Sequence, residues 1–125
     1  MYKYIRHIAF PVFPLLNTLS GSSSGKIYKK FNGKLVKITS PRYGVFKKST
    51  HCVECGIEGK ILAAEKTDPK SDKYHFNLYA IRADGKEILM TKDHIVPKSK
   101  GGPNTMNNYQ TMCERCNSRK GNNIQ

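Results

Sequence analysis

The pattern of hydrophobic and polar positions predicts a β-hairpin in the first half of the chain. Residues 26–39 read KIYKKFNGKLVKIT, in which aromatic and β-branched residues lie on both sides of Asn32-Gly33. This pair accepts the positive φ angles that a two-residue hairpin turn requires. We therefore expect two short strands here, with lysines on the solvent side.

A second hairpin is predicted for residues 74–96, YHFNLYAIRADGKEILMTKDHIV, with Asp84-Gly85 at the turn. Its return strand delivers Asp93 and His94 at its end. The clearest helical signal lies in the tail, where CERCNSRK at residues 113–120 precedes a glycine stop. Hairpins combined with one short helix predict the α+β class.

Apolar residues also gather near the start, where residues 8–19 read IAFPVFPLLNTL. Pro11 and Pro14 oppose a helix, and the run is shorter than the ~20 residues needed to span a membrane. We interpret it as an extended arm that packs on a surface, and we expect no membrane partner. The following SGSSSG, residues 20–25, is a flexible linker by composition. The predicted order is an arm with linker at 1–25, followed by a basic β-hairpin extension at 26–50.

Length and charge favour one small domain that binds a polyanion. A chain of 125 residues can bury one modest core. The first 53 residues carry ten Lys or Arg and no acid, whereas the remainder carries twelve basic and nine acidic residues. Ten of the thirteen net charges therefore fall in the first part. Such a block attracts nucleic acids or anionic membranes, and the alternative is a solubilising face.

The four cysteines form two CxxC pairs, Cys52 with Cys55 and Cys113 with Cys116, separated by 57 residues. Two such turns can complete a tetrahedral zinc site, and four thiolates leave no open position for substrate. Disulfides are the alternative, but a chain without a convincing signal sequence would occupy a reducing compartment where they rarely persist. We expect a structural Zn²⁺ that ties the region around the first pair to the C-terminal helix.

Candidate chemistry therefore falls on Asp93 and His94. A carboxylate is a hard ligand for Mg²⁺, and a histidine can accept a proton from water. At the end of a strand the two side chains could approach one site from two sides. Taken alone, such a pair is more often a surface acid beside a structural histidine.

The residues that follow resemble the HNH nucleases, the ββα-metal or His-Me finger family. The resemblance rests on DHIVP at 93–97, KGG at 100–102, Asn108 as the middle asparagine, and CxxCNxxKG at 113–121. With the first cysteine pair it covers about residues 51–122. It implies a nuclease domain at residues 51–125, in which two strands and one helix grip a divalent ion.

The resemblance also implies residue roles. It assigns the catalytic metal to Asp93 and Asn117, and the general base that activates water to His94. It assigns to Asn108 a hydrogen bond with the loop that orients this histidine. Asparagine replaces the histidine found in other versions of the last position, and a neutral amide favours Mg²⁺ or Mn²⁺ over zinc.

Other polar and aromatic residues near these motifs allow two interpretations. Five basic side chains are candidates for phosphate contacts, with ordinary solvated charge as the alternative: Lys98, Lys100, Arg115, Arg119 and Lys120. The aromatic residues among the early lysines are expected to fill a small core, with base stacking as the alternative: Tyr28, Phe31, Tyr43 and Phe46. We interpret Asn104 as a loop former, and His51 and His75 as structural or exposed.

The sequence thus predicts a metal-dependent DNA endonuclease built on a ββα-metal finger with zinc-stapled CxxC pairs, preceded by a basic β-hairpin extension. One alternative is a zinc-stapled nucleic-acid-binding module without catalysis, and another is a structural RNA- or ribosome-associated zinc protein. A monomer would nick DNA, whereas a homodimer or larger nucleoprotein assembly could cut both strands. By resemblance we expect a bacterial or phage source, and hence the cytoplasm of a bacterial or phage-infected cell.

Overall fold

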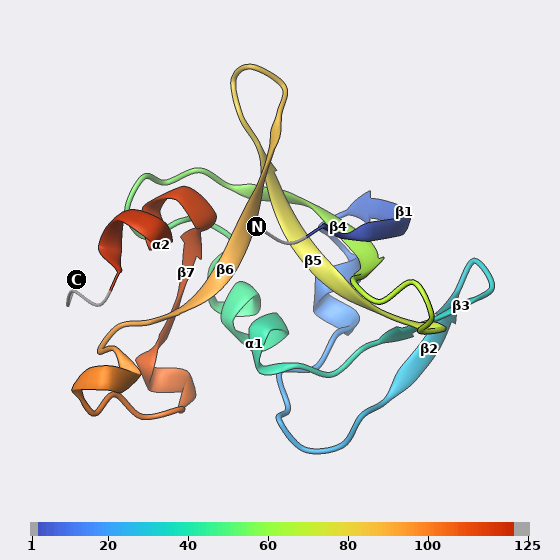
Figure 1. Ribbon diagram of the computed structural model, residues 1–125, viewed down its shortest axis with the longest axis horizontal. Coiled ribbons are helices and arrows are strands. Elements are labelled where there is room, and N and C mark those ends of the chain that lie inside the picture. Colours follow the sequence, from blue (N-terminus) through green and yellow to red (C-terminus); the bar gives the residue numbers. More distant parts are fainter. Residues whose placement is uncertain (1–2, 122–125) are drawn as a thin grey trace.

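The computed structural model describes residues 3–121, which form one curled sheet of seven strands and two α-helices (Figure 1). The strands are β1 (Ile5–Pro11), β2 (Tyr28–Phe31), β3 (Lys34–Lys37), β4 (Gly59–Lys66), β5 (Lys73–Ile81), β6 (Glu87–His94) and β7 (Tyr109–Cys113). The α-helices are α1 (Pro41–Lys48) and α2 (Glu114–Lys120), and the 3-10 helices are η1 (Leu15–Thr18), η2 (Lys98–Lys100) and η3 (Met106–Asn108). Residues 1–2 and 122–125, at the outer ends of the predicted arm and nuclease domain, lie outside the described part. Within that part, no helix is long and apolar enough to cross a membrane.

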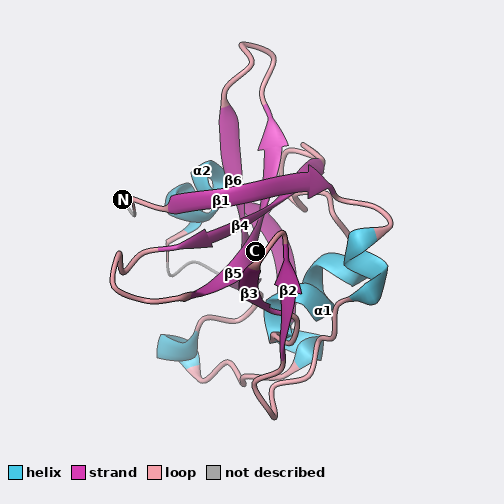
Figure 2. Ribbon diagram, turned by 90° about the vertical axis from the view of Figure 1, so that its right-hand side faces the viewer, coloured by secondary structure: helices cyan, strands magenta, loops and turns pink. Residues whose placement is uncertain are grey.

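Strand β5 organises the sheet because three other strands pair with it (Figure 2). Antiparallel β4 follows most of one edge. On the opposite edge, parallel β3 pairs with the beginning of β5 and antiparallel β6 pairs with its end. Strand β6 then pairs with β7, and β1 extends the sheet beyond β4. The strands of the N-terminal region and those that carry the predicted chemistry therefore belong to one sheet.

Both predicted hairpins are present. Strands β2 and β3 pair around Asn32 and Gly33, whose φ angles are 50° and 87°. Strands β5 and β6 pair around a turn that contains Gly85 at φ 84°. The predicted C-terminal helix is α2, and it ends before Gly121. These elements were readable because short local signals specify them.

Helix α1 was not predicted. Ser40 caps it by accepting a hydrogen bond from the Arg42 N–H, and Pro41 occupies the first turn. Tyr43 and Phe46 are each 1% exposed in the core, so they do not serve base stacking. The helix fills the gap that β3 and β6 leave on the edge of β5. There the Tyr43 hydroxyl accepts from the Phe76 N–H and Arg42 donates to the Phe76 carbonyl.

The predicted arm is extended, but it is a strand of the sheet and a part of the core rather than a surface segment. Strand β1 pairs with β4, and the following Leu16 and Leu19 are fully buried. The serine- and glycine-rich loop also packs against the body at Gly21. A Cβ there would lie 2.6 Å from the Gly44 Cα of α1, so the close approach requires glycine.

A buried carboxylate joins three neighbouring strands, β1, β4 and β5. Glu65 on β4 is 2% exposed and accepts from Arg6 at 2.8 Å, from Asn77 at 2.8 Å and from Tyr79 at 2.6 Å. Asn77 in turn accepts from Arg42 at 2.6 Å. Because each buried polar group has a partner, the network fixes β1, β4 and β5 relative to α1.

Candidate functional site

The two CxxC pairs converge on one point. Their four Sγ atoms lie within 4.8 Å of one another, and Cys55 Sγ is 3.9 Å from Cys113 Sγ. Sulfur atoms at ~2.3 Å from a tetrahedral Zn²⁺ are about 3.8 Å apart, so the cluster has the size of a zinc site. The Val53 N–H donates to the Thr111 carbonyl of β7, which fixes the first pair against the strand that leads to the second.

The thiols themselves favour a bound cation. Burial and the neighbouring sulfurs raise the pKa of Cys116 to about 12. Burial opposes ionisation of Cys52 as well, but backbone N–H groups, that of Cys55 foremost, lower its pKa to about 7. Four adjacent thiolates would repel one another, so full ionisation requires a positive ion between them. The donor set fits zinc, and it separates this cluster from the predicted site at the end of β6.

Asp93 lies at the end of β6, where it is 6% exposed and held by two donors. Gln110 Nε2 donates to its Oδ2 at 2.9 Å, and Lys120 Nζ is 3.0 Å from the same oxygen. The Lys120 ammonium also donates to the His94 carbonyl. A carboxylate offers about four lone-pair positions, so these contacts do not exhaust its capacity to bind a cation.

The position of Lys120 differs from the expected phosphate contact. Its side chain is 3% exposed, and its ammonium binds Asp93 and the His94 carbonyl from the end of α2. Asp93 and His94 precede Lys120 by 27 and 26 residues, so the sequence alone gives no sign of these contacts. They form because α2 packs against β6. In this structure Lys120 fixes the carboxylate and the backbone of the adjacent histidine.

The His94 imidazole is positioned by two residues of the following segment. Its Nε2 lies 2.8 Å from Asn104 Oδ1, and its ring meets the Tyr109 ring edge-on with centroids 5.1 Å apart. An amide oxygen only accepts, so Nε2 carries the proton in this contact and the neutral imidazole keeps its lone pair on Nδ1. Asn104 was expected to be a simple loop former. Its position in the loop gave no signal of this contact.

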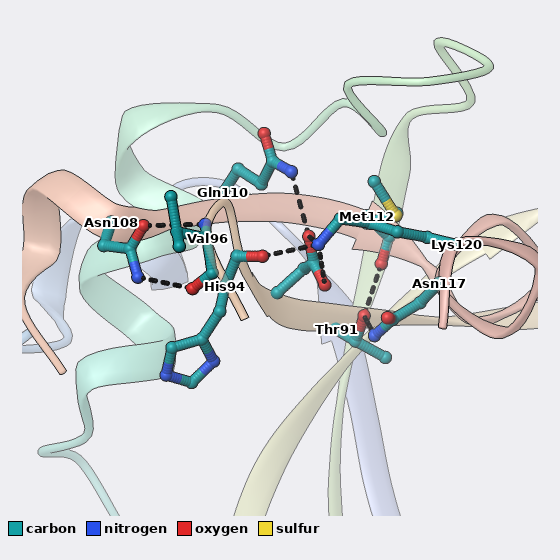
Figure 3. A network of polar contacts seen from close by, with 9 residues as sticks. Thr91, His94, Val96, Asn108, Gln110, Met112, Asn117 and Lys120 are labelled. Carbon is teal, nitrogen blue, oxygen red and sulfur yellow. Dashed lines mark hydrogen bonds and ion pairs between the residues drawn. The ribbon is translucent and has the colours of Figure 1, made fainter. Parts of the chain in front are cut away.

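Asn108 closes the loop that follows His94. Its Oδ1 accepts from the Val96 N–H at 2.9 Å, and its Nδ2 donates to the Val96 and Pro103 carbonyls at 3.0 and 2.9 Å. These contacts join both ends of the loop 96–103, and Figure 3 shows the two between Asn108 and Val96. Gly102 passes so close that an added Cβ would lie 1.7 Å from the Val96 oxygen. The hydrogen bonds to the loop expected of Asn108 are therefore present.

We expect Gly102→Ala to destabilise the protein by about 1–3 kcal/mol, because the methyl group would force the loop away from the Asn108 contacts. Thermal unfolding followed by circular dichroism would measure the change. Ser99→Ala, at an exposed position of η2, is the control and should leave the melting temperature unchanged. An unchanged melting temperature for Gly102→Ala would show that the loop adapts without loss.

Asn117 lies on α2 opposite the end of β6. Its Nδ2 donates to Thr91 Oγ1 at 2.9 Å, and the Thr91 hydroxyl donates to the Met112 carbonyl at 2.7 Å (Figure 3). Because the amide nitrogen is engaged, the orientation of the amide is fixed and its oxygen remains an acceptor. Carboxylate and amide oxygens from Asp93 and Asn117 are the donor types that a hard divalent ion prefers.

These side chains line a hollow of about 430 Å³ whose walls include Asp93, His94 and Asn117. Of the five residues expected to contact phosphate, Lys98 lies in the wall of this hollow, and Lys120 forms the ion pair with Asp93. Lys100 is exposed beside it on η2, Arg115 lines a different hollow with Asp84, and Arg119 donates to Cys116 Sγ at 3.1 Å. Lys92 also lines the site, with its Nζ 4.2 Å from the centre of the Tyr109 ring, and the sequence did not indicate it.

Comparison with known families agrees with this part of the chain. Residues 83–125 match the family model described as HNH endonuclease, which confirms the resemblance over about the last third of the sequence. No curated protein and no solved structure matches the chain significantly. The matched stretch contains Asp93, His94, Asn108, Asn117 and the second cysteine pair.

Proposed function

We propose that this protein is a metal-dependent endonuclease that hydrolyses phosphodiester bonds in DNA. The observation that carries the proposal is the meeting of His94, Asp93 and Asn117 at one hollow, within the segment that matches the HNH endonuclease family. In this proposal β6, β7 and α2 are the ββα-metal finger, and residues 51–125 are the functional nuclease unit. The family match supports a function related to nucleic acids, and the arrangement of the side chains supports hydrolysis.

His94 acts as the general base. Its Nδ1 lone pair accepts a proton from water, while Asn104 holds the Nε2 proton and thereby the tautomer. Asn108 keeps the loop closed beneath the ring through Val96 and Pro103. Removal of a proton from water at a fixed position is the first requirement for attack on a phosphodiester.

Asp93 and Asn117 would hold a divalent ion such as Mg²⁺ or Mn²⁺, which supplies positive charge to the phosphate and the departing oxygen when bound. Lys120 keeps the Asp93 carboxylate in place and adds its own positive charge next to the site. Lys98 and Lys92, which line the hollow, would contact the phosphate backbone. Lys100, Arg115 and Arg119 would contribute through more distant contacts with the duplex.

The cysteine cluster binds a structural Zn²⁺ in this proposal. The ion would fix α2 to the first cysteine pair and thereby hold Asn117 and Lys120 against β6. The basic hairpin region, residues 26–50, would add affinity for DNA that does not depend on sequence. Monomers would nick, and cleavage of both strands would require a second copy or a nucleoprotein partner.

Nicking of supercoiled plasmid tests the proposal. The zinc-loaded protein should convert the plasmid to open-circle or linear DNA with Mg²⁺ or Mn²⁺, and EDTA should stop the reaction. If the protein binds the plasmid but leaves it intact with both ions, it is a zinc-stapled nucleic-acid-binding module without catalysis. If it binds no DNA at all, the DNA-directed function is wrong.

We expect Asn104→Ala to lower the nicking rate about tenfold, because the imidazole loses the acceptor that fixes its tautomer. The affinity for DNA should remain unchanged, because in this proposal Asn104 contacts the general base His94 and not the DNA phosphate. Asn104→Asp retains an acceptor oxygen and should restore most of the rate. Equal rates for Asn104→Ala and the wild type would contradict the positioning role.

A further inference from the structure

A second hollow, of about 370 Å³, lies between the β2–β3 hairpin, the start of α1 and the beginning of β5. The β2–β3 hairpin and the beginning of β5, which carry most of its lining residues, lie on the other side of α1 from the end of β6 (Figure 1). Its volume is within the roughly 300–1,000 Å³ of small-molecule sites. The function proposed above gives residues 26–50 a general affinity for DNA, but it assigns no ligand to this hollow.

The lining of this hollow is strongly basic. Lys37, Arg42 and Lys73 contribute positive charges, and no Asp or Glu is found among the described residues that line it. Lys73 Nζ lies 5.1 Å from the centre of the Tyr28 ring, which holds this lysine over the hairpin. Hydroxyl groups of Ser40 and Ser71 add polar groups to the wall. Converging cations and hydroxyls are the groups that recognise a phosphate.

Arg42 is held in the wall of this hollow by neutral acceptors. Its Nη2 donates to the Phe76 carbonyl at 3.0 Å and to Asn77 Oδ1 at 2.6 Å, and both acceptors are neutral. Within residues 3–121, no carboxylate forms an ion pair with this guanidinium. Glu65 contacts the other side of the Asn77 amide and forms its ion pair with Arg6. Burial lowers the pKa of Arg42, which indicates that its charge is costly here without an anion.

Of the neighbouring groups, the start of α1 adds to this positive potential, whereas His75 adds no charge. Burial first, and the charge of Arg42 second, lower the pKa of His75 to about 4, so this imidazole is neutral at pH 7. The first turn of α1 also faces the hollow through Ser40 and Arg42, where helix N–H groups carry partial positive charge. An anion would therefore meet favourable charge from the hairpin, the helix and β5 together.

We propose that this hollow binds a nucleotide phosphate, and that its source is the backbone of a DNA strand engaged at the same time by the protein. The identity of the strand rests on the proposed function, whereas the affinity for a phosphate rests on the basic hollow alone. The strand would then be held at two places on either side of α1.

Binding of a labelled DNA duplex to the full chain, measured by fluorescence anisotropy at several salt concentrations, tests this site. His94→Ala protein is used throughout so that cleavage does not interfere. The double variant Lys37→Gln/Lys73→Gln should raise the dissociation constant about tenfold. The slope of the logarithm of the affinity against the logarithm of the salt concentration should become shallower by about one, which corresponds to the loss of one phosphate contact. The matched control is Lys30→Gln/Lys34→Gln, which removes the same charge from exposed positions of the same hairpin outside the hollow and should change affinity less than threefold.

A deoxynucleoside monophosphate is the second probe. Its binding is detected through changes in the NMR signals of Arg42 and His75. If it binds the hollow while the Lys37→Gln/Lys73→Gln variant keeps full duplex affinity, the source of the phosphate is a free nucleotide. The proposed site would be overturned if both double variants lost the same amount of duplex affinity. It would also be overturned if neither the duplex nor the nucleotide bound at the hollow. Thermal melting of both variants establishes that they are folded, and plasmid nicking by the wild type separately reports the proposed activity.

Discussion

Removing zinc from the four-cysteine cluster is expected to unfold the C-terminal half of the protein. Structural zinc sites contribute about 10–16 kcal/mol in small zinc-finger peptides, which is comparable to the ~5–15 kcal/mol that stabilises a typical native protein. Here the ion would tie α2 to the segment at Cys52, and α2 has seven residues, too few to be stable alone. Treatment with a strong chelator, or Cys116→Ser, should therefore abolish cooperative thermal unfolding.

Circular dichroism and zinc analysis of the same samples measure this effect. Ser118→Ala is the matched control, because it alters an exposed position of the same helix and should leave both the melting temperature and the zinc content unchanged. Adding Zn²⁺ back to the chelated protein should restore the transition. A chelated protein that melts as the untreated one does would show that the thiols pack without an ion.

His94→Ala is expected to reduce DNA nicking by about 10²–10⁴-fold, the contribution of a general base to a proton transfer. Alanine removes the Nδ1 acceptor but keeps the backbone carbonyl that receives Lys120, so the end of β6 should retain its shape. The variant should therefore bind DNA and Mg²⁺ as the wild type does. Plasmid nicking and equilibrium DNA binding, measured in parallel, separate these two effects.

His51→Ala provides the matched control. Its imidazole is 56% exposed and lies 3.8 Å from Glu58, away from the hollow at the end of β6. Its loss should leave the nicking rate within twofold of the wild type, as expected for an exposed residue outside the site. If His94→Ala nicks as fast as His51→Ala, the general base lies elsewhere and the proposed mechanism fails.

Sequence signals were sufficient where a few adjacent residues determine the structure. Asn32-Gly33 and Gly85 specify their turns through φ angles that few other residues adopt. The cysteine spacing likewise predicted the convergence of four sulfur atoms, because each CxxC turn brings its own pair together. The HNH resemblance identified the candidate residues from a string of positions along 93–121.

Helix α1 shows why other elements could not be predicted. Its eight residues carry no clear amphipathic pattern, and its stability comes from distant partners. At the end of α1, the Thr111 hydroxyl donates to the Ser49 carbonyl. Near the start of α1, the Tyr43 hydroxyl accepts a hydrogen bond from the Phe76 N–H of β5. Tertiary contacts of this kind override weak local propensity. The ion pair of Lys120 with Asp93 was hidden for the same reason.

The separation of the two cysteine pairs along the chain has a consequence for biosynthesis. A ribosome makes Cys52 and Cys55 well before Cys113 and Cys116, with 57 residues between the pairs. The sheet around β4 and β5 can begin to form on the nascent polypeptide, as domains commonly do during translation. The helix that presents Asn117 and Lys120 can dock only after the second pair has emerged. A prematurely terminated product would lack the second cysteine pair and these side chains together, so incomplete translation would release a product without the proposed nuclease site.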